Sequence, residues 1–160
     1  MSLDNNVQSV HSVLMPRTIS ATLARKRWSE YFDRAVHDRW PVLIERGSRE
    51  RGLLIGSDEL ELVLSRYEFH PEAFFEPAAV SIWLPELALF GRGESFADAQ
   101  ADLVDEVRDY IDEYVADAPL YLRAPNRAEH FPYALRAFVA DSAGRLPDIL
   151  FAEPAVAADA

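Results

Sequence analysis

The stretch from Ser95 to about Val115 constrains the fold more than any other part of this 160-residue chain. Its apolar residues recur every three or four positions, which is the period of one face of an α-helix. These residues are Phe96, Ala99, Leu103, Val107, Tyr110, Ile111 and Tyr114. Seven acidic residues lie mostly on the other faces, and Ser95 can cap the first turn. The pattern predicts a long helix with one side packed and the other side acidic.

Short strands are predicted just before this helix. In residues 79–93, AVSIWLPELALFGRG, the apolar side chains Val80, Ile82 and Leu84 alternate, and two glycines end the segment. This pattern indicates a hairpin. Residues 68–78 contain two prolines and a change in composition, so we place a domain boundary there that leaves room for an edge strand.

The residues after the long helix give weaker signals. Residues 124–141 predict another helix despite Pro132, and residues 146–151, LPDILF, fit either a strand or a short docking segment. We expect residues 1–15 and 152–160 to be disordered, because neither end has the pattern of a packed element.

The first part of the chain predicts the element order β-α-α-β-β-α. A short strand ends at Ser20, which is a suitable helix N-cap, and Ser29 is a candidate start for a second helix. The segments PVLIER and RGLLIG flank a turn at Gly47 and predict an antiparallel hairpin. A further helix is expected from Ser57 to about Arg66. Within the helical region, we expect Trp28 and Phe32 to hold the helix against its core.

Charge is distributed unevenly along the sequence, whose formal net charge is −11. Residues 16–55 contain nine bases and five acids, a net charge of +4. Residues 67–160 contain six arginines and eighteen acids, a net charge of −12, and should avoid nucleic acid. A basic cluster in the first part is therefore a candidate DNA-binding surface.

Arg25 is the main candidate in this cluster, because it follows the Ser20 cap closely on a helix that could reach phosphates or a guanine edge. Lys26 and Arg27 point in different directions around the helix. Further arginines would extend the surface if the hairpin folds beside that helix, namely Arg17, Arg46, Arg49 and Arg51. The alternative, which charge alone does not exclude, is an ordinary solubilising face.

No pattern supports catalysis. The four histidines lack metal-ligand spacing, there is no cysteine, and GRGES at residues 91–95 lacks the ending of a phosphate-binding loop. The acids of the long helix fit a solvated face better than a general acid and base. We therefore expect no catalytic residue, metal or cofactor. Without a signal peptide or membrane-spanning run, a cytoplasmic location is expected.

Residues 17–63, RTISATLARKRWSEYFDRAVHDRWPVLIERGSRERGLLIGSDELELV, resemble the N-terminal domain of Phd/YefM antitoxins of type II toxin-antitoxin systems. The resemblance implies a homodimer that binds operator DNA and represses its own operon, with higher oligomers on DNA left open. Arg25 occupies the Ala-Arg position and Arg46 the Leu-Ile-x-Arg position, both of which contact DNA in the family. Arg17, Lys26 and Arg27 are added from neighbourhood and charge.

Residues 80–111, VSIWLPELALFGRGESFADAQADLVDEVRDYI, resemble more loosely the HicB antitoxin domain. The predicted fold class is therefore α+β. Residues 16–67 form a Phd/YefM-like DNA-binding and dimerisation domain, and residues 68–151 a smaller, acidic, strand-strand-helix HicB-like domain. The resemblance implies an antitoxin and transcription repressor that captures a cognate toxin. A basic RelE-like ribonuclease is favoured by the acidic half. The alternative is a non-catalytic protein-interaction or assembly module without DNA binding.

Overall fold

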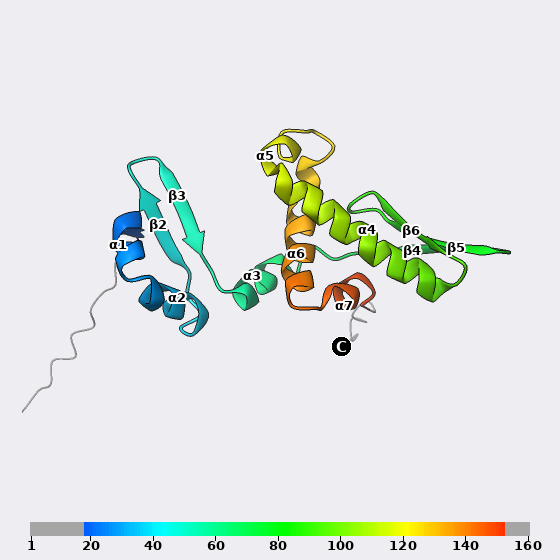
Figure 1. The fold of residues 1–160 in the computed structure, drawn as a ribbon, viewed down its shortest axis with the longest axis horizontal. Coiled ribbons are helices and arrows are strands. Elements are labelled where there is room, and N and C mark those ends of the chain that lie inside the picture. The colour runs from blue at the N-terminus through cyan, green and yellow to red at the C-terminus, as the bar shows by residue number, and fades with distance from the viewer. Residues whose placement is uncertain (1–17, 153–160) are drawn as a thin grey trace, which may run out of the picture. The chain divides into compact units, whose positions relative to one another are not determined.

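The computed structural model describes residues 18–152. Within these residues it is an α+β structure with two three-stranded sheets and seven α-helices (Figure 1). The chain divides into two compact units, of which the first ends at Gly56 and the second begins at Ser57. Arg17, the expected disordered leader and almost all of the expected tail lie outside the described residues. No helix in residues 18–152 is long and apolar enough to cross a membrane.

The elements up to residue 64 follow the expected order β-α-α-β-β-α, and the first unit contains all of them except the last helix. Its elements are β1 (Thr18–Ser20), α1 (Ala21–Lys26), α2 (Trp28–Val36), β2 (Val42–Arg46) and β3 (Glu50–Leu54). Strand β1 pairs in parallel with β2, and β2 and β3 form the predicted antiparallel hairpin. The Oγ of Ser20 accepts a hydrogen bond from the Leu23 N–H at 3.2 Å, which confirms the expected N-cap.

The core of the first unit is small. Its buried cluster consists of Ile19, Ala24, Tyr31 and Val42, and a few half-buried aliphatic side chains pack at its margin. The expectation that Trp28 and Phe32 anchor the helix in this core is wrong, since they are 51% and 44% exposed. The physical reason is that α2 has apolar residues on two faces, and the face with Tyr31 lies against the sheet.

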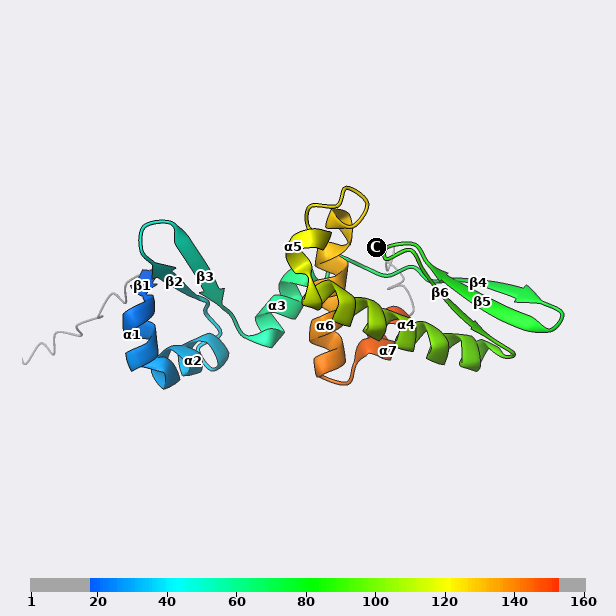
Figure 2. The same ribbon diagram turned by 45° about the horizontal axis from the view of Figure 1, so that its top comes forward.

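The second unit contains three antiparallel strands and most of the helices (Figures 1 and 2). Its elements are α3 (Ser57–Leu64), β4 (Glu72–Glu76), β5 (Ala79–Leu84), β6 (Leu89–Gly93), α4 (Phe96–Ala116), α5 (Ala118–Tyr121), the 3₁₀ helix η1 (Ala128–His130), α6 (Phe131–Ser142) and α7 (Leu146–Leu150). The hairpin, the edge strand β4 and the helix containing Pro132 agree with the sequence predictions. Residues 146–150 form a helix, so the strand alternative is wrong. Leu146 and Leu150 are fully buried, as a docking segment requires.

The long predicted helix is α4, and it packs on β5 and β6. Ser95 and Asp98 form a capping box at its start. Gly91 lets the helix approach closely, because a Cβ atom at this position would lie 2.3 Å from the Ala99 carbonyl oxygen. Ala99, Leu103 and Val107 are fully buried in the resulting core, but Phe96 is exposed although it belongs to the predicted stripe.

The boundary between the units lies earlier than residue 67, where the sequence placed it. Helix α3 packs against α6, and Arg145 forms an ion pair with Glu61 of α3. These contacts attach α3 to the second unit. The second unit is the larger of the two, whereas a smaller second domain was expected.

Candidate DNA-binding and protein-binding surfaces

The basic cluster lies at the junction of α1 and α2. Arg25 and Lys26 occupy the last turn of the six-residue α1, and Arg27 separates the two helices. All three side chains are exposed. The Nη2 atom of Arg27 lies 2.5 Å from a carboxylate oxygen of Glu30, whereas Arg25 and Lys26 have no carboxylate partner among residues 18–152. These two cations are therefore the ones most available to an anionic ligand.

Arg46 lies at the end of β2 and is exposed. Its Nε donates to the Glu50 carboxylate at 2.5 Å, and this hydrogen bond raises the pKa of the Arg46 guanidinium above its ordinary value. A shallow depression of about 260 Å³ is lined by Ile44, Arg46, Glu50 and two neighbouring residues of β3. An exposed ion pair contributes little stability, so a phosphate can replace Glu50 at small cost.

Local geometry relates Arg46 to Arg25. Ser20 is paired with Glu45 in the sheet, so α1 begins beside the end of β2 that carries Arg46. Arg25 lies roughly 6 Å further along the helix axis than Ala21. Both predicted DNA contacts thus belong to one small unit, and α1, which is six residues long, presents Arg25 from its last turn.

Helix α2 carries an exposed apolar stripe, Trp28, Phe32 and Val36, which we call the α2 outer stripe. These residues are spaced by four positions and are at least 40% exposed. The ring centroids of Trp28 and Phe32 are 6.0 Å apart. Sequence reasoning missed the stripe as a surface, although a short helix with apolar residues on two faces is a signal for a second packing partner.

The exposed side of α4 is acidic, as predicted. A hollow of about 370 Å³ beside it is lined by Glu106, Asp109 and Glu113 together with Tyr110, His130 and neighbouring residues. The Tyr110 hydroxyl and the His130 Nδ1 are 2.6 Å apart. Burial, and secondarily the charge of Arg127, lowers the pKa of His130 below its ordinary value.

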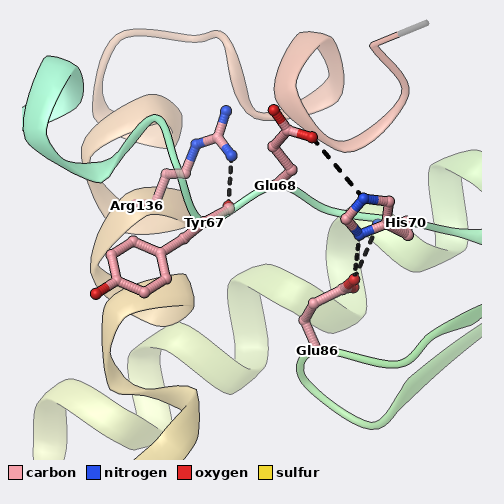
Figure 3. Close-up of polar contacts among 5 residues, drawn as sticks. All are labelled: Tyr67, Glu68, His70, Glu86 and Arg136. Carbon is pink, nitrogen blue, oxygen red and sulfur yellow. Dashed lines mark hydrogen bonds and ion pairs between the residues drawn. The ribbon is translucent and has the colours of Figure 1, made fainter. Parts of the chain in front are cut away.

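A polar cluster ties the segment between α3 and β4 to the rest of the second unit (Figure 3). The Glu86 Oε1 accepts from the backbone N–H of His70 at 3.1 Å and lies 2.8 Å from His70 Nδ1. The Nη1 of Arg136 donates to the Tyr67 carbonyl at 2.5 Å. Sequence reasoning did not find this cluster, because its members are far apart in the chain. It fixes the path of the chain into β4.

Residues 18–152 contain no group of three or more histidine, aspartate or glutamate side chains placed to hold a metal ion. His37 and His70 are exposed and each lies near a carboxylate, whereas His130 is half-buried. His11 lies outside the described residues.

Comparison with known proteins identifies the family. Residues 15–150 match a family model described as an antitoxin of toxin-antitoxin, RelE/RelB, TA system. The chain belongs to this antitoxin family. A crystal structure of an antitoxin part of a toxin/antitoxin system from Syntrophomonas wolfei subsp. wolfei matches with a TM-score of 0.73 and 27% sequence identity, covering 86% of this chain and 99% of that chain. No curated protein matches the sequence significantly.

Membership of this family implies one partner of the antitoxin, namely a cognate toxin. It does not show which surface of the antitoxin binds which partner. The antitoxin has three exposed candidates among its described residues. They are the cations of α1 and β2, the α2 outer stripe and the acidic side of the second unit.

Proposed function

We propose that this antitoxin neutralises a RelE-like ribonuclease toxin by direct binding in the cytoplasm and represses its own operon by binding operator DNA as a homodimer. The family match supports the antitoxin role. The observation that carries toxin capture and DNA binding is the separation of charge. Arg25 and Lys26 are exposed and have no carboxylate partner among residues 18–152, whereas the chain after residue 66 has a net charge of −12. Two surfaces of opposite charge suit two different partners.

Both halves fit the more specific resemblances. The order β-α-α-β-β of the first unit supports a Phd/YefM-like DNA-binding domain. The antiparallel strands β4, β5 and β6 followed by the capped helix α4 support a HicB-like second domain.

The homodimer is supported by what the first unit leaves exposed. Among its described residues, 18–56, the buried cluster has four members, and so small a core usually needs further stabilisation such as oligomerisation. The α2 outer stripe supplies an apolar surface for this purpose. A second copy is the natural occupant, because two copies of one stripe are complementary about a twofold axis and would place two basic clusters in one particle.

DNA binding by the first unit is supported by Arg25 and Lys26, which are exposed and have no carboxylate partner in the described part of the chain. In the proposed complex they contact operator phosphates or base edges, and Arg46 exchanges Glu50 for a phosphate. A dimer doubles these contacts, and the spacing of its two clusters then sets the separation of the operator half-sites.

Operator binding is tested by gel-shift titration with duplex DNA from upstream of the antitoxin gene. Changing Arg25 to Ala should weaken binding roughly tenfold and reduce the salt dependence, because one cationic contact is lost. Changing Arg123 to Ala is the matched control, since this exposed arginine lies in the acidic unit and its loss alters the net charge equally. Equal affinity of the wild-type protein for operator and random duplex would refute repression.

Toxin capture is tested by co-expressing the antitoxin with the adjacent reading frame and purifying on a single tag. A stoichiometric complex that relieves growth arrest is the expected result. The bound protein should be basic, because the acidic second unit would repel an acidic one. Failure of any neighbouring gene product to co-purify would refute this part of the proposal.

A protein-interaction module without DNA binding is the second candidate. It is favoured by one observation, namely that Arg27, Arg46 and Arg51 each already have a carboxylate partner and so resemble ordinary surface ion pairs. The gel-shift experiment separates the two candidates, because the alternative predicts no preference for the operator.

A further inference from the structure

The two edges of the sheet in the second unit differ. At β6, the backbone N–H of Arg92 donates to the Asp102 carboxylate of α4 at 2.8 Å, so the helix covers this edge. At the other edge, all five residues of β4 are exposed, and β5 is its only strand partner among residues 18–152. Figure 2 shows β4 along the margin of the sheet, with β6 next to α4. The outer side of β4, which we call the β4 edge, is an open template for another strand.

Aromatic side chains lie on both faces of this edge. Phe74 pairs with Ser81 and faces away from α4, whereas Phe75 pairs with the buried Val80 and lies on the side of α4. Phe74 is 49% exposed and Phe75 is 72% exposed. An added strand would pair with the outward-facing backbone groups of β4. Because successive side chains of a strand point to opposite faces, its side chains would also cover both rings.

The ends of β4 carry the same charge. Glu72 and Glu76 are exposed, and neither has a cationic partner within residues 18–152. Antiparallel pairing of two copies centred on Phe74 would set Glu72 of one copy opposite Glu76 of the other. Pairing centred on either glutamate would set that residue opposite itself. Like charges in direct opposition are destabilising, so a second copy is disfavoured in these three registers.

The charge pattern instead suits a segment that is apolar in its middle and basic at both ends. We propose that the β4 edge binds an extended segment of the cognate toxin with this pattern, which extends the sheet to four strands. This inference rests on the proposed toxin capture and specifies its binding mode. The polar cluster of His70 and Glu86 supports it, because it fixes the chain that leads into β4 and so holds the edge in place before the toxin arrives.

The inference is tested on the full-length antitoxin with the toxin that co-purifies with it. The double variant Glu72→Lys, Glu76→Lys should weaken toxin binding at least tenfold in titration calorimetry. The control variant Asp33→Lys, Asp38→Lys changes the net charge by the same amount in the first unit, outside the acidic unit proposed to capture the toxin, and it should change the affinity less than threefold. All four residues are exposed, so the thermal melts should stay close to that of the wild type.

Hydrogen exchange gives an independent measurement. Backbone amides of residues 72–76 should exchange at least tenfold more slowly in the toxin complex than in the free antitoxin, because an added strand protects them. A complex without this protection, or with equal losses of affinity in the two double variants, would overturn the inference while leaving toxin capture intact. Protection of these amides in the free antitoxin that rises with its concentration would identify a second copy as the occupant and also overturn it. If wild-type antitoxin binds no toxin, the proposed function fails, and this inference fails with it.

Discussion

Replacing Phe32 with Ala should dissociate the proposed homodimer. Phe32 is 44% exposed in the single chain, and a phenylalanine side chain offers about 200 Å² for burial. Roughly 90 Å² of the Phe32 side chain is therefore still exposed in each copy, or about 180 Å² in the two copies of a dimer. At about 25 cal/mol per Å² this area corresponds to about 4.5 kcal/mol.

Not all of this area converts to affinity, because a dimer interface rarely encloses every exposed atom. We expect a loss of about 2 to 4 kcal/mol, which raises the dimer dissociation constant roughly 30- to 700-fold. The first unit itself should keep its fold, since Phe32 is not in its core and Ala is favourable in a helix.

Sedimentation equilibrium of the full chain over a wide concentration range measures this constant directly. Phe90→Ala is the matched control, because Phe90 is the same residue type, is 46% exposed and lies in the second unit. The reasoning is refuted if wild-type antitoxin stays monomeric at about 100 µM, far above a typical specific dissociation constant. It is also refuted if the Phe32 and Phe90 variants dimerise equally.

Two further predictions concern the second unit and its fold. Gly91→Ala should destabilise the protein by about 2 kcal/mol or more in urea denaturation, because the added methyl group meets the backbone of α4. The control is Gly52→Ala, where nothing lies within 4 Å of the new methyl group, and it should be neutral or slightly stabilising. The second prediction concerns His130. Because burial lowers the pKa of His130, the unfolded state binds a proton more readily than the folded state, and stability should fall as the pH drops below about 6.5. Urea midpoints at pH 7.5 and 5.5 should therefore differ more in the wild type than in His130→Gln, and equal differences would contradict the assignment.

Local signals in the sequence predicted most of the elements correctly. The Ser20 and Ser95 caps, the alternation of Val80, Ile82 and Leu84 and the long stripe of α4 all depend on neighbours within a few positions. Such patterns act through short-range hydrogen bonds and side-chain periodicity, so they can be recognised without knowing the fold.

The failures concern contacts between elements that are distant in sequence. The pattern of α3 shows that it is a helix, but its attachment to α6 depends on packing and on the Arg145 to Glu61 ion pair. An edge strand in residues 68–78 was expected, but the sequence does not reveal that α4 covers β6 and leaves the outer side of β4 open. Periodicity identifies an apolar face but does not name its partner, which is why Trp28 was assigned to a core that it does not enter.

The candidate DNA-binding residues can be ranked only with the structure, and this ranking leads to a final prediction. The sequence shows which residues are cationic but not which of them are paired. In the structure Arg46 is bound to Glu50, whereas Arg25 has no carboxylate partner in residues 18–152. If Arg46 contacts operator phosphates, Glu50 competes with the DNA for the same guanidinium. Changing Glu50 to Gln should therefore strengthen operator binding by a few-fold, since exposed ion pairs are weak and one negative charge near the phosphates is removed. The double variant Arg46→Ala, Glu50→Gln separates these causes, because any gain that survives without Arg46 comes from the lost charge alone. Gel-shift titrations in which Glu50→Gln leaves the affinity unchanged or lowers it would show that Arg46 does not contact the operator.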